Sequence, residues 1–230
     1  MTKQAEKEYA FKVDPAHLYR RPYDCPRVFR EFATVLQLFG ERFAGGSVLD
    51  LGCGPGWTSL LLTRAGYEVV GVDISERMIE IARHRSELEN APVTFLVSDM
   101  EELDLGRRDF DAVLLFDSLH HCPGYAEVLR RAWEHLRPGG WLLLFETTWL
   151  HRYSPHARGE ARKYGVTELG FTRRQLRRAL HAAGFRRLTR YHDPGPAYRG
   201  WRGLLWASLR LWCGFLACFP QSKQIILAEK

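Results

Sequence analysis

Short apolar runs and longer amphipathic stretches alternate along the middle of this chain, and this alternation constrains the fold more than any other feature. The apolar runs have the length and composition of buried parallel strands, and they lie at 47–51, 67–72, 93–97, 110–116 and 141–146. Helical stretches separate them. Because parallel neighbours in a sheet require crossover connections, the pattern predicts a doubly wound α/β sheet.

The helices and the remaining strands are predicted from their end signals. Ser75 is the N-cap of a helix, Thr172 with Gln175 forms a capping box, and Pro138-Gly139-Gly140 closes the helix before it. The predicted helices are 57–65, 75–88, 124–137 and 172–183, and the later strands are 185–192 and 224–229. At 230 residues we expect one domain. It is divided into a helical N-terminal cap (1–44), a core sheet (45–193 and 223–230) and an apolar helical insertion before the last strand (194–222).

Three alternate glycines follow the first strand, in the sequence VLDLGCGPGW at 48–57. In an open α/β sheet, ligands bind beyond the carboxyl ends of the strands at such a turn. Gly52, Gly54 and Gly56 allow positive φ and remove Cβ atoms, and the next helix offers N–H groups to an anionic ligand. The spacing is not the G-x-G-x-x-G of dinucleotide sites, and no G-K-[ST] follows. A carboxylate therefore suits the turn better than a pyrophosphate.

Acidic residues end three successive predicted strands, at Asp50, Asp73 and Asp99. The carboxylate of Asp73 can accept hydrogen bonds from both hydroxyl groups of a ribose, and Ile74 beside it offers an apolar surface to a base. Asp99 can accept a hydrogen bond from an exocyclic amine. Together with the glycine turn, these acids predict a nucleoside site with an amino-acid tail in place of phosphates.

Five segments, VLDLGCGPGW, VVGVDIS, VSDMEEL, FDAVLLFDSLHH and LRPGGWLLLFE, together resemble the class I S-adenosylmethionine-dependent methyltransferases of the small-molecule, type 11 kind. The resemblance is strong over 46–146. It implies a Rossmann-like, seven-stranded sheet with an antiparallel final strand, and S-adenosyl-L-methionine as cofactor. By the same resemblance the methionyl part, the ribose and the adenine would be held by Asp50, Gly52, Gly54, Gly56, Asp73, Ile74, Asp99, the backbone of Met100, and Phe116.

The candidate catalytic residues are His120, His121 and Glu146, at the ends of the fourth and fifth predicted strands. The methyl group of this cofactor is already electrophilic, so the protein must align the acceptor and, for a hydroxyl group, remove its proton. An imidazole suits that task. The paired histidines are similar to those of natural-product O-methyltransferases, in which they are proposed bases. Glu146 would orient or assist them.

The expected function is methyl transfer to a small, partly hydrophobic acceptor, with oxygen as the preferred atom and nitrogen or carbon as alternatives. A nicotinamide oxidoreductase would have the same kind of sheet, but this sequence lacks the third glycine of the dinucleotide-binding motif. A nucleoside-binding module without catalysis, acting through the apolar insertion, is the alternative from another class. Nucleic acid is not an expected partner, because the N/D-P-P-Y/F motif of base methyltransferases is absent and the arginines at 173–178 have the pattern of a solvated helix face.

We expect no metal ion from the sequence, with a metal-assisted catechol site as the alternative. His151, His156 and Tyr153 lie in the segment that in this family borders the acceptor, but the histidines do not have metal-ligand spacing. His120 and His121 are adjacent and would point apart in an extended chain.

The apolar insertion has several possible roles. At 1.5 Å per residue, 203–219 would span about 25 Å as a helix, short of a bilayer core of about 30 Å, and Arg210 interrupts it. We expect a lid that packs on the N-terminal helices and closes an acceptor cavity. A homodimer face or a membrane-surface helix over 199–219, with its tryptophans at the interface, remains open. The charged N-terminus and the absence of a CxxC pair favour a cytoplasmic protein with reduced thiols.

Overall fold

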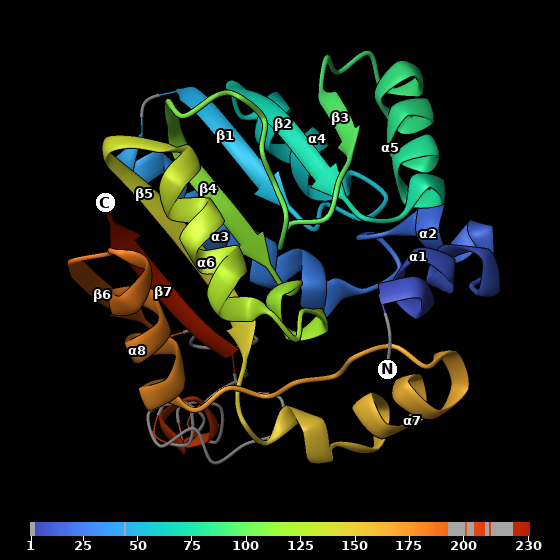
Figure 1. The fold of residues 1–230 in the computed structure, drawn as a ribbon. Helices are drawn as coiled ribbons and strands as arrows, with labels where there is room; N and C mark the ends of the chain where they lie inside the picture. Colours follow the sequence, from blue (N-terminus) through green and yellow to red (C-terminus); the bar gives the residue numbers. More distant parts are fainter. Residues whose placement is uncertain (1–2, 44, 193–200, 202–204, 210–211, 213–222) are drawn as a thin grey trace.

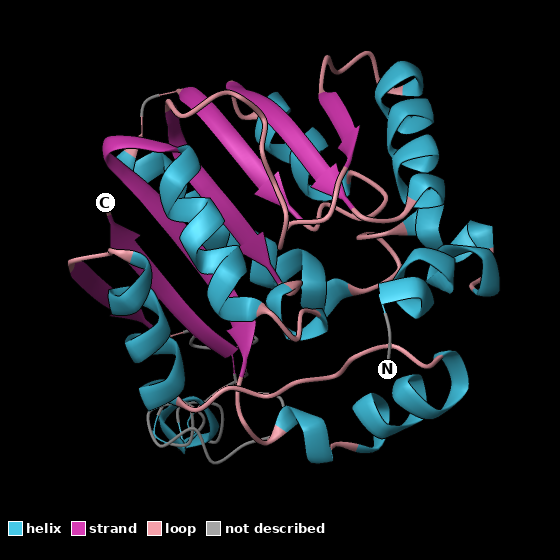
Figure 2. Cartoon of the chain, viewed as in Figure 1, coloured by secondary structure: helices cyan, strands magenta, loops and turns pink. Residues whose placement is uncertain are grey.

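The computed structural model describes the chain except residues 1–2, 44, 193–200, 202–204, 210–211 and 213–222, and in the described part a seven-stranded sheet lies between helical layers (Figures 1 and 2). Its strands are β1 (Gly46–Leu51), β2 (Tyr67–Asp73), β3 (Thr94–Val97), β4 (Phe110–Phe116), β5 (Leu136–Thr147), β6 (Arg187–Tyr191) and β7 (Lys223–Glu229). The order in the sheet is β3-β2-β1-β4-β5-β7-β6. The first five strands are parallel, and β7 runs antiparallel to both its neighbours. The predicted doubly wound sheet with an antiparallel final strand is confirmed.

Helices cover both faces of this sheet and the edge at which the parallel strands end. They are α1 (Lys3–Lys12), α2 (Pro15–Arg20), α3 (Pro26–Arg42), α4 (Trp57–Arg64), α5 (Glu76–Leu88), α6 (Tyr125–His135), α7 (Pro155–Tyr164) and α8 (Arg173–Ala183). Figure 1 shows α1, α2 and α7 beyond the carboxyl ends of the parallel strands, where a ligand site is expected.

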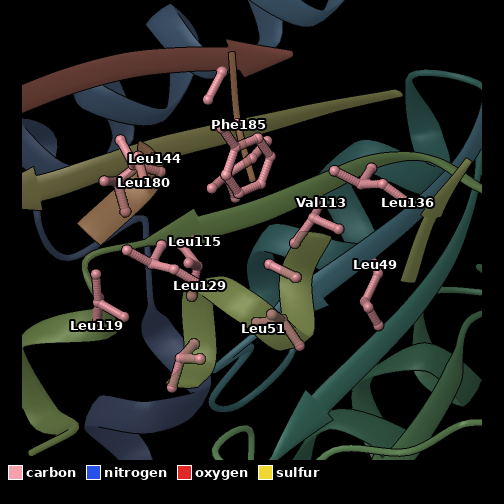
Figure 3. Packing of buried hydrophobic residues seen from close by; sticks show 14 of the residues in the cluster. Leu49, Leu51, Val113, Leu115, Leu119, Leu129, Leu136, Leu144, Leu180 and Phe185 are labelled. Carbon is pink, nitrogen blue, oxygen red and sulfur yellow. The ribbon is translucent and has the colours of Figure 1, made fainter. Parts of the chain in front are cut away.

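The hydrophobic core has one layer on each face of the sheet. On one face, Leu129 of α6 and Leu180 of α8 pack against Leu115 and Leu144 of the central strands (Figure 3). On the other face, α3 contributes a buried row, made of Val28, Phe32, Val35, Leu38 and Phe39. The helix α3 is therefore part of the core layer, whereas the sequence placed all of 1–44 in a cap.

The register of the strands brings the expected site residues to one edge. Leu51, the last residue of β1, is paired with Val72 of β2 and with Leu115 of β4. The residues that follow these strands therefore meet at the same edge of the sheet, which places Gly52 close to Asp73.

The boundary between α6 and β5 differs most from the sequence prediction. The helix expected over 124–137 ends at His135, and β5 begins at once with Leu136, which pairs with Phe110. The Pro138-Gly139-Gly140 segment thus lies inside an irregular start of the strand and not at a helix end.

The helix α7 was not predicted, because its buried residue is Ala157 and it has no apolar stripe. Its cap signals, Ser154 and Gly165, were the available clue.

Most of the insertion at 194–222 lies outside the described residues. Those that are described at 201, 205–209 and 212 are helical. The large side chains among them are exposed, from 49% for Leu209 to 67% for Trp201. At these positions the expected burial against the N-terminal helices is not found. Within the described part of the chain, no helix is both long and apolar enough to cross a membrane.

Candidate active site

A cavity of about 800 Å³ opens at the carboxyl ends of the parallel strands, under α1, α2 and α7. Eight of the residues expected from the sequence line it, namely Gly52, Gly54, Asp73, Ile74, Asp99, Met100, His120 and His121. Four others, Asp50, Gly56, Phe116 and Glu146, are not part of its lining. The structure therefore brings most of the predicted residues together and gives the remaining four supporting positions.

The glycine turn contributes bare backbone to the cavity. Gly52 has φ +74°, and a Cβ there would lie 2.5 Å from the Cβ of Ser118, so a larger residue does not fit. Gly54 has φ +52°, and a Cβ there would meet nothing within 4 Å. The N–H of Gly54 donates a hydrogen bond to Asp73 at 2.9 Å. The turn thus needs glycine at Gly52 for packing and leaves open space beside Gly54.

Asp50, Gly56 and Phe116 hold this turn in place from behind. The carboxylate of Asp50 accepts hydrogen bonds from the hydroxyl groups of Thr58 and Ser59, at 2.6 Å each, and its burial raises its pKa to about 6. A Cβ on Gly56 would lie 2.7 Å from the Cβ of Ala82, so this glycine allows α4 and α5 to pack closely. Phe116 is buried in the aromatic core that contains Phe145.

Asp73 and Asp99 are the acids that reach the cavity. Asp73 accepts hydrogen bonds from the N–H groups of Gly54 and Ser75, at 2.9 Å each, and burial raises its pKa. Asp99 forms an ion pair of 2.6 Å with Lys3 of α1. Lys3 was missed in the sequence, because nothing in a charged N-terminus indicates which acid it will reach.

The two adjacent histidines do not point apart. Residues Leu119–His121 form a turn of 3₁₀ helix, and the ring centroids of His120 and His121 lie 4.1 Å apart. The expectation of diverging side chains assumed an extended chain, and it was wrong because the chain turns immediately after β4. The pair therefore acts as one cluster.

His120 is anchored by Glu146, whose carboxylate is fully buried. Nδ1 of His120 lies 3.0 and 3.1 Å from the two oxygens of Glu146, which also accepts hydrogen bonds from the N–H groups of Leu119 and Thr147. Burial opposes the charged imidazole, but the carboxylates around it, Glu146 first, raise the pKa of His120 to about 9. Glu146 thus orients His120 without touching the cavity.

His121 is held differently and stays neutral. Its Nδ1 lies 2.8 Å from the carbonyl oxygen of Thr167, which accepts the Nδ1 hydrogen. Burial, together with the charge of His120, lowers the pKa of His121 to about 4. At neutral pH the two imidazoles therefore differ in charge, although they are neighbours in sequence.

Glu168 joins this cluster from the segment between α7 and α8, and the sequence did not predict it. Its Oε2 lies 2.6 Å from Nε2 of His151 and 3.8 Å from Nε2 of His120. Burial opposes its ionisation, but the hydrogen bond from His151 lowers its pKa. His151 and His156 both line the cavity, while Tyr153 is exposed and does not.

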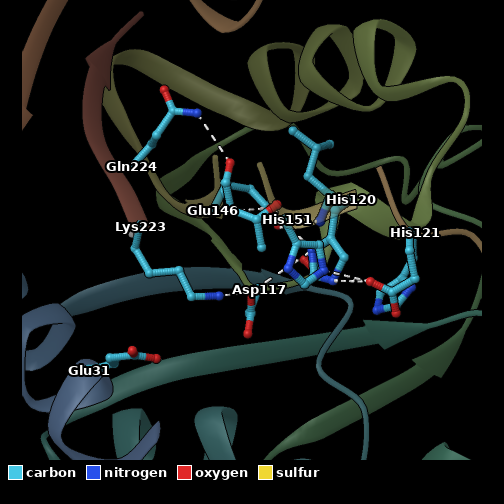
Figure 4. A network of polar contacts seen from close by, with 12 residues as sticks. Glu31, Asp117, His120, His121, Glu146, His151, Lys223 and Gln224 are labelled. Atoms are coloured by element: carbon cyan, nitrogen blue, oxygen red, sulfur yellow. Dashed lines mark hydrogen bonds and ion pairs between the residues drawn. The ribbon is translucent and has the colours of Figure 1, made fainter. Parts of the chain in front are cut away.

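Asp117 and Lys223 complete the cluster from the ends of β4 and β7. Lys223 forms a close ion pair with Asp117, whose pKa is held low by Lys223 and His120 despite burial. In Figure 4, Lys223 reaches Asp117 from the side opposite His121. These residues are also part of the cavity lining. Neither was a predicted site residue, because the pair is formed between positions more than 100 residues apart.

The comparisons with known proteins agree with this geometry. The family described as "Methyltransferase domain" matches residues 48–140. A ubiquinone biosynthesis O-methyltransferase of Paramagnetospirillum magneticum is 37% identical over 98 residues, which are 43% of this chain and 39% of that protein. The chain spans about half or less of the length of the curated relatives it matches.

Solved structures show the same fold. The phosphoethanolamine N-methyltransferase 2 of Haemonchus contortus, in complex with S-adenosyl-L-methionine, has a TM-score of 0.65 and 23% identity, covering 87% of this chain and 52% of that one. The [4+2]-cyclase SpnF has a TM-score of 0.61 and 20% identity, covering 86% of this chain and 80% of that one. A fold shared by proteins with such different names does not by itself define the reaction.

Proposed function

We propose that this chain transfers a methyl group from S-adenosyl-L-methionine to a small acceptor, with a hydroxyl oxygen as the preferred atom. The proposal is supported by the methyltransferase-domain match over residues 48–140 and by the similarity to an O-methyltransferase. One observation carries the proposal. The glycine turn with Asp73 and the paired histidines open onto the same cavity, so a cofactor on the turn and an acceptor beside His121 would be neighbours.

The described residues fit this cofactor. Gly54 leaves open space for a ligand at the turn, and the buried carboxylate of Asp73 has oxygen lone pairs left to accept from a ribose. Ile74 and Met100, which line the cavity, would contact the adenine. Asp99 would accept a hydrogen bond from the adenine amine while one of its oxygens stays paired with Lys3. Asp50, Gly56 and Phe116 support the turn without lining the cavity.

The bound cofactor would supply an electrophilic methyl group, which leaves the protein to align the acceptor and to manage its proton. His121 is neutral and can take a proton, whereas His120 carries positive charge and would stabilise the anion that forms. Glu146 positions His120 through its two oxygens. An amine acceptor would also have to lose a proton first, so N-methylation is the nearest alternative.

The acceptor is expected to be small and more polar than the sequence indicated. A cavity of about 800 Å³ is in the range that small molecules and cofactors occupy. Beyond the nucleoside side, its lining includes several cationic or polar residues, among them Arg21, Arg27, His151, His156 and Lys223. Of the apolar insertion, none of the described residues lines this cavity.

Calorimetry on Asp73→Ala tests the cofactor site. Losing a hydrogen-bonding carboxylate should weaken S-adenosyl-L-methionine binding by about 1.5–3 kcal/mol, or roughly ten- to a hundredfold. Asp104→Ala is the matched control, because its carboxylate also accepts from the N–H two residues ahead, at 3.0 Å, but lies on the exposed surface outside the cavity. Unchanged affinity in a folded Asp73→Ala protein would refute the placement.

Turnover separates the enzyme from its alternatives. Incubating the protein with methyl-labelled cofactor and a fractionated metabolite extract should give a labelled product. Tight cofactor binding without any transfer would favour a nucleoside-binding module. Titration with a nicotinamide dinucleotide tests the oxidoreductase alternative, which requires that the protein bind this ligand in place of S-adenosyl-L-methionine.

A further inference from the structure

The side chains of His120, His121 and Glu168 form a compact set of metal-ligand atoms. One donor atom from each lies within 4.8 Å of the others. Imidazole nitrogen and carboxylate oxygen are the ligands of catalytic zinc sites and of the two-histidine, one-carboxylate iron sites. We propose that His120, His121 and Glu168 bind Zn²⁺ or a similar first-row divalent transition metal ion.

In each of the two histidines, one ring nitrogen, Nδ1, is already hydrogen-bonded to a protein oxygen. Nδ1 of His120 is held by Glu146 at 3.0 Å, and Nδ1 of His121 by the carbonyl oxygen of Thr167 at 2.8 Å. In both rings this leaves Nε2 as the metal-binding atom. Metal-bound histidines characteristically donate their second N–H to a carboxylate or a backbone carbonyl, which fixes the tautomer and the ring orientation. One histidine here has each kind of anchor.

The third ligand is anchored as well. Glu168 accepts from Nε2 of His151 at 2.6 Å, which fixes its carboxylate between the rings of His120 and His151. Figure 4 shows His151 beside His120 and Glu146, with His121 on the far side of His120. All three proposed ligands are therefore positioned by a hydrogen bond from outside the set.

The surrounding charge favours a cation. Three carboxylates, those of Asp117, Glu146 and Glu168, surround His120, and the ammonium group of Lys223 pairs with one of them. The set is thus short of positive charge, and a bound divalent cation would supply it.

The site faces the cavity, which leaves room for a further ligand. His120, His121 and Glu168 all line it, and three protein ligands are what catalytic zinc sites have, with the fourth position for water or substrate. Imidazole ligands favour Zn²⁺, Fe²⁺ or Ni²⁺ over Mg²⁺, which prefers oxygen and water.

This site would deepen the proposed function, on which its role rests. A hydroxyl group of the acceptor in the open position would lose its proton more easily: the O–H bond breaks, the electron pair stays on oxygen, and the proton goes to a water molecule. The two imidazoles would then act as ligands, and direct proton transfer to His121 would not be needed.

Metal binding is tested on the full chain after chelator treatment and dialysis. Co²⁺ should bind at one equivalent with the visible absorption of a four- or five-coordinate centre, Zn²⁺ should displace it, and excess Mg²⁺ should not. His121→Ala and Glu168→Gln should each weaken binding at least about tenfold, since even the loss of an outer-shell partner costs about 10–100-fold. His156→Ala is the matched control, a histidine of the same cavity outside the set, and should bind as the unchanged protein does.

The outcomes are distinct from those for the proposed function. No stoichiometric Co²⁺ binding, or equal binding by the folded His121→Ala and Glu168→Gln variants, would overturn the metal site. Calorimetry with S-adenosyl-L-methionine on the same samples shows whether the cofactor site is present. Cofactor binding without metal would refute this inference alone, and metal binding without cofactor would refute the proposed function alone.

Discussion

Asp50, Asp73 and Asp99 lie at or just beyond the ends of neighbouring strands, but their surroundings give them different tasks. Asp73 and Asp99 face the cavity, whereas Asp50 faces the first turn of α4 and is bound there by Thr58 and Ser59. The sequence predicts the row of acids correctly. It does not show the direction of each side chain, because direction depends on which hydroxyl groups the next helix brings near.

Asp50→Asn should change how stability depends on pH. Burial raises the pKa of Asp50 from 3.8 to about 6, so its favourable protonated state is fully present below pH 3.8 and is lost as pH rises through 6. An asparagine keeps an oxygen for the two hydroxyl donors but does not titrate. Relative to Asp50→Asn, the unchanged protein should lose up to about 3 kcal/mol of unfolding free energy between pH 4 and 7.

Urea unfolding at closely spaced pH values measures this difference. Asp104→Asn serves as the comparison, since its carboxylate is exposed and its pKa is lowered by the N–H of Gly106. A constant gap between Asp50→Asn and the unchanged protein from pH 4 to 7 would mean that Asp50 is not desolvated as the structure indicates.

At the scale of one element, two glycines of the same turn have different roles: Gly52 is needed for packing, and Gly54 leaves space for a ligand. Gly54→Ala places a methyl group in open space beside the cavity, so folding should cost only about 1–2 kcal/mol for the left-handed backbone. Cofactor affinity should fall at least about tenfold, because the methyl group takes ligand space. Gly52→Ala should destabilise the fold by more, since its Cβ would overlap Ser118. Thermal unfolding and calorimetry together check both expectations.

Gly106→Ala is a closely matched control for Gly54→Ala. Gly106 has φ +63°, a methyl group added there would meet nothing within 4 Å, and the residue lies outside the cavity. The Gly106→Ala protein should lose similar stability and keep full cofactor affinity. Equal affinity in the Gly54→Ala protein would show that the ligand does not approach the turn.

Elements with a strong apolar pattern were predicted well, and those without one were not. Four parallel strands, β1, β2, β4 and β5, were found because they are largely buried on both faces, and β3 was found from its short apolar run although Val97 is 47% exposed. The helix α8 was found because its capping box precedes an apolar stripe. By contrast, α7 buries little, and the start of β5 follows α6 without a loop. Neither segment has a periodic pattern of apolar residues in the sequence, so hydrophobic periodicity could not locate α7 or the start of β5.

At the scale of the whole molecule, the site is assembled from segments that only the fold brings together. Eight lining residues between Gly52 and His121 were predicted, because they lie at or just beyond the ends of recognisable strands, whereas Asp117 in the same stretch was not. Lys3, Glu168 and Lys223 could not be, because they come from the first helix, a loop and the last strand. Their pairing with Asp99, His151 and Asp117 depends on long-range packing, which a single sequence does not encode in its local pattern.

The apolar segment around 201–212 allows a last prediction. Trp201, Leu205, Leu209 and Trp212 recur at helical spacing and are 49–67% exposed, and the chain has a net charge of +6. Exposed apolar faces with tryptophan beside positive charge favour a membrane surface. The protein should therefore pellet with anionic vesicles, less at high salt.

Leu205→Asp with Leu209→Asp should abolish that pelleting and leave cofactor affinity unchanged, because neither residue lines the cavity. Leu88→Asp is the matched control, since Leu88 of α5 is a leucine at least as exposed, at 67%, and lies far from the segment in sequence. It should pellet as the unchanged protein does. Sedimentation velocity tests the alternative, a homodimer. The membrane interpretation is wrong if the unchanged protein does not pellet with vesicles and forms dimers, while the double variant is monomeric. In that case the same apolar face is buried between two copies of the chain, where charge and salt would matter little.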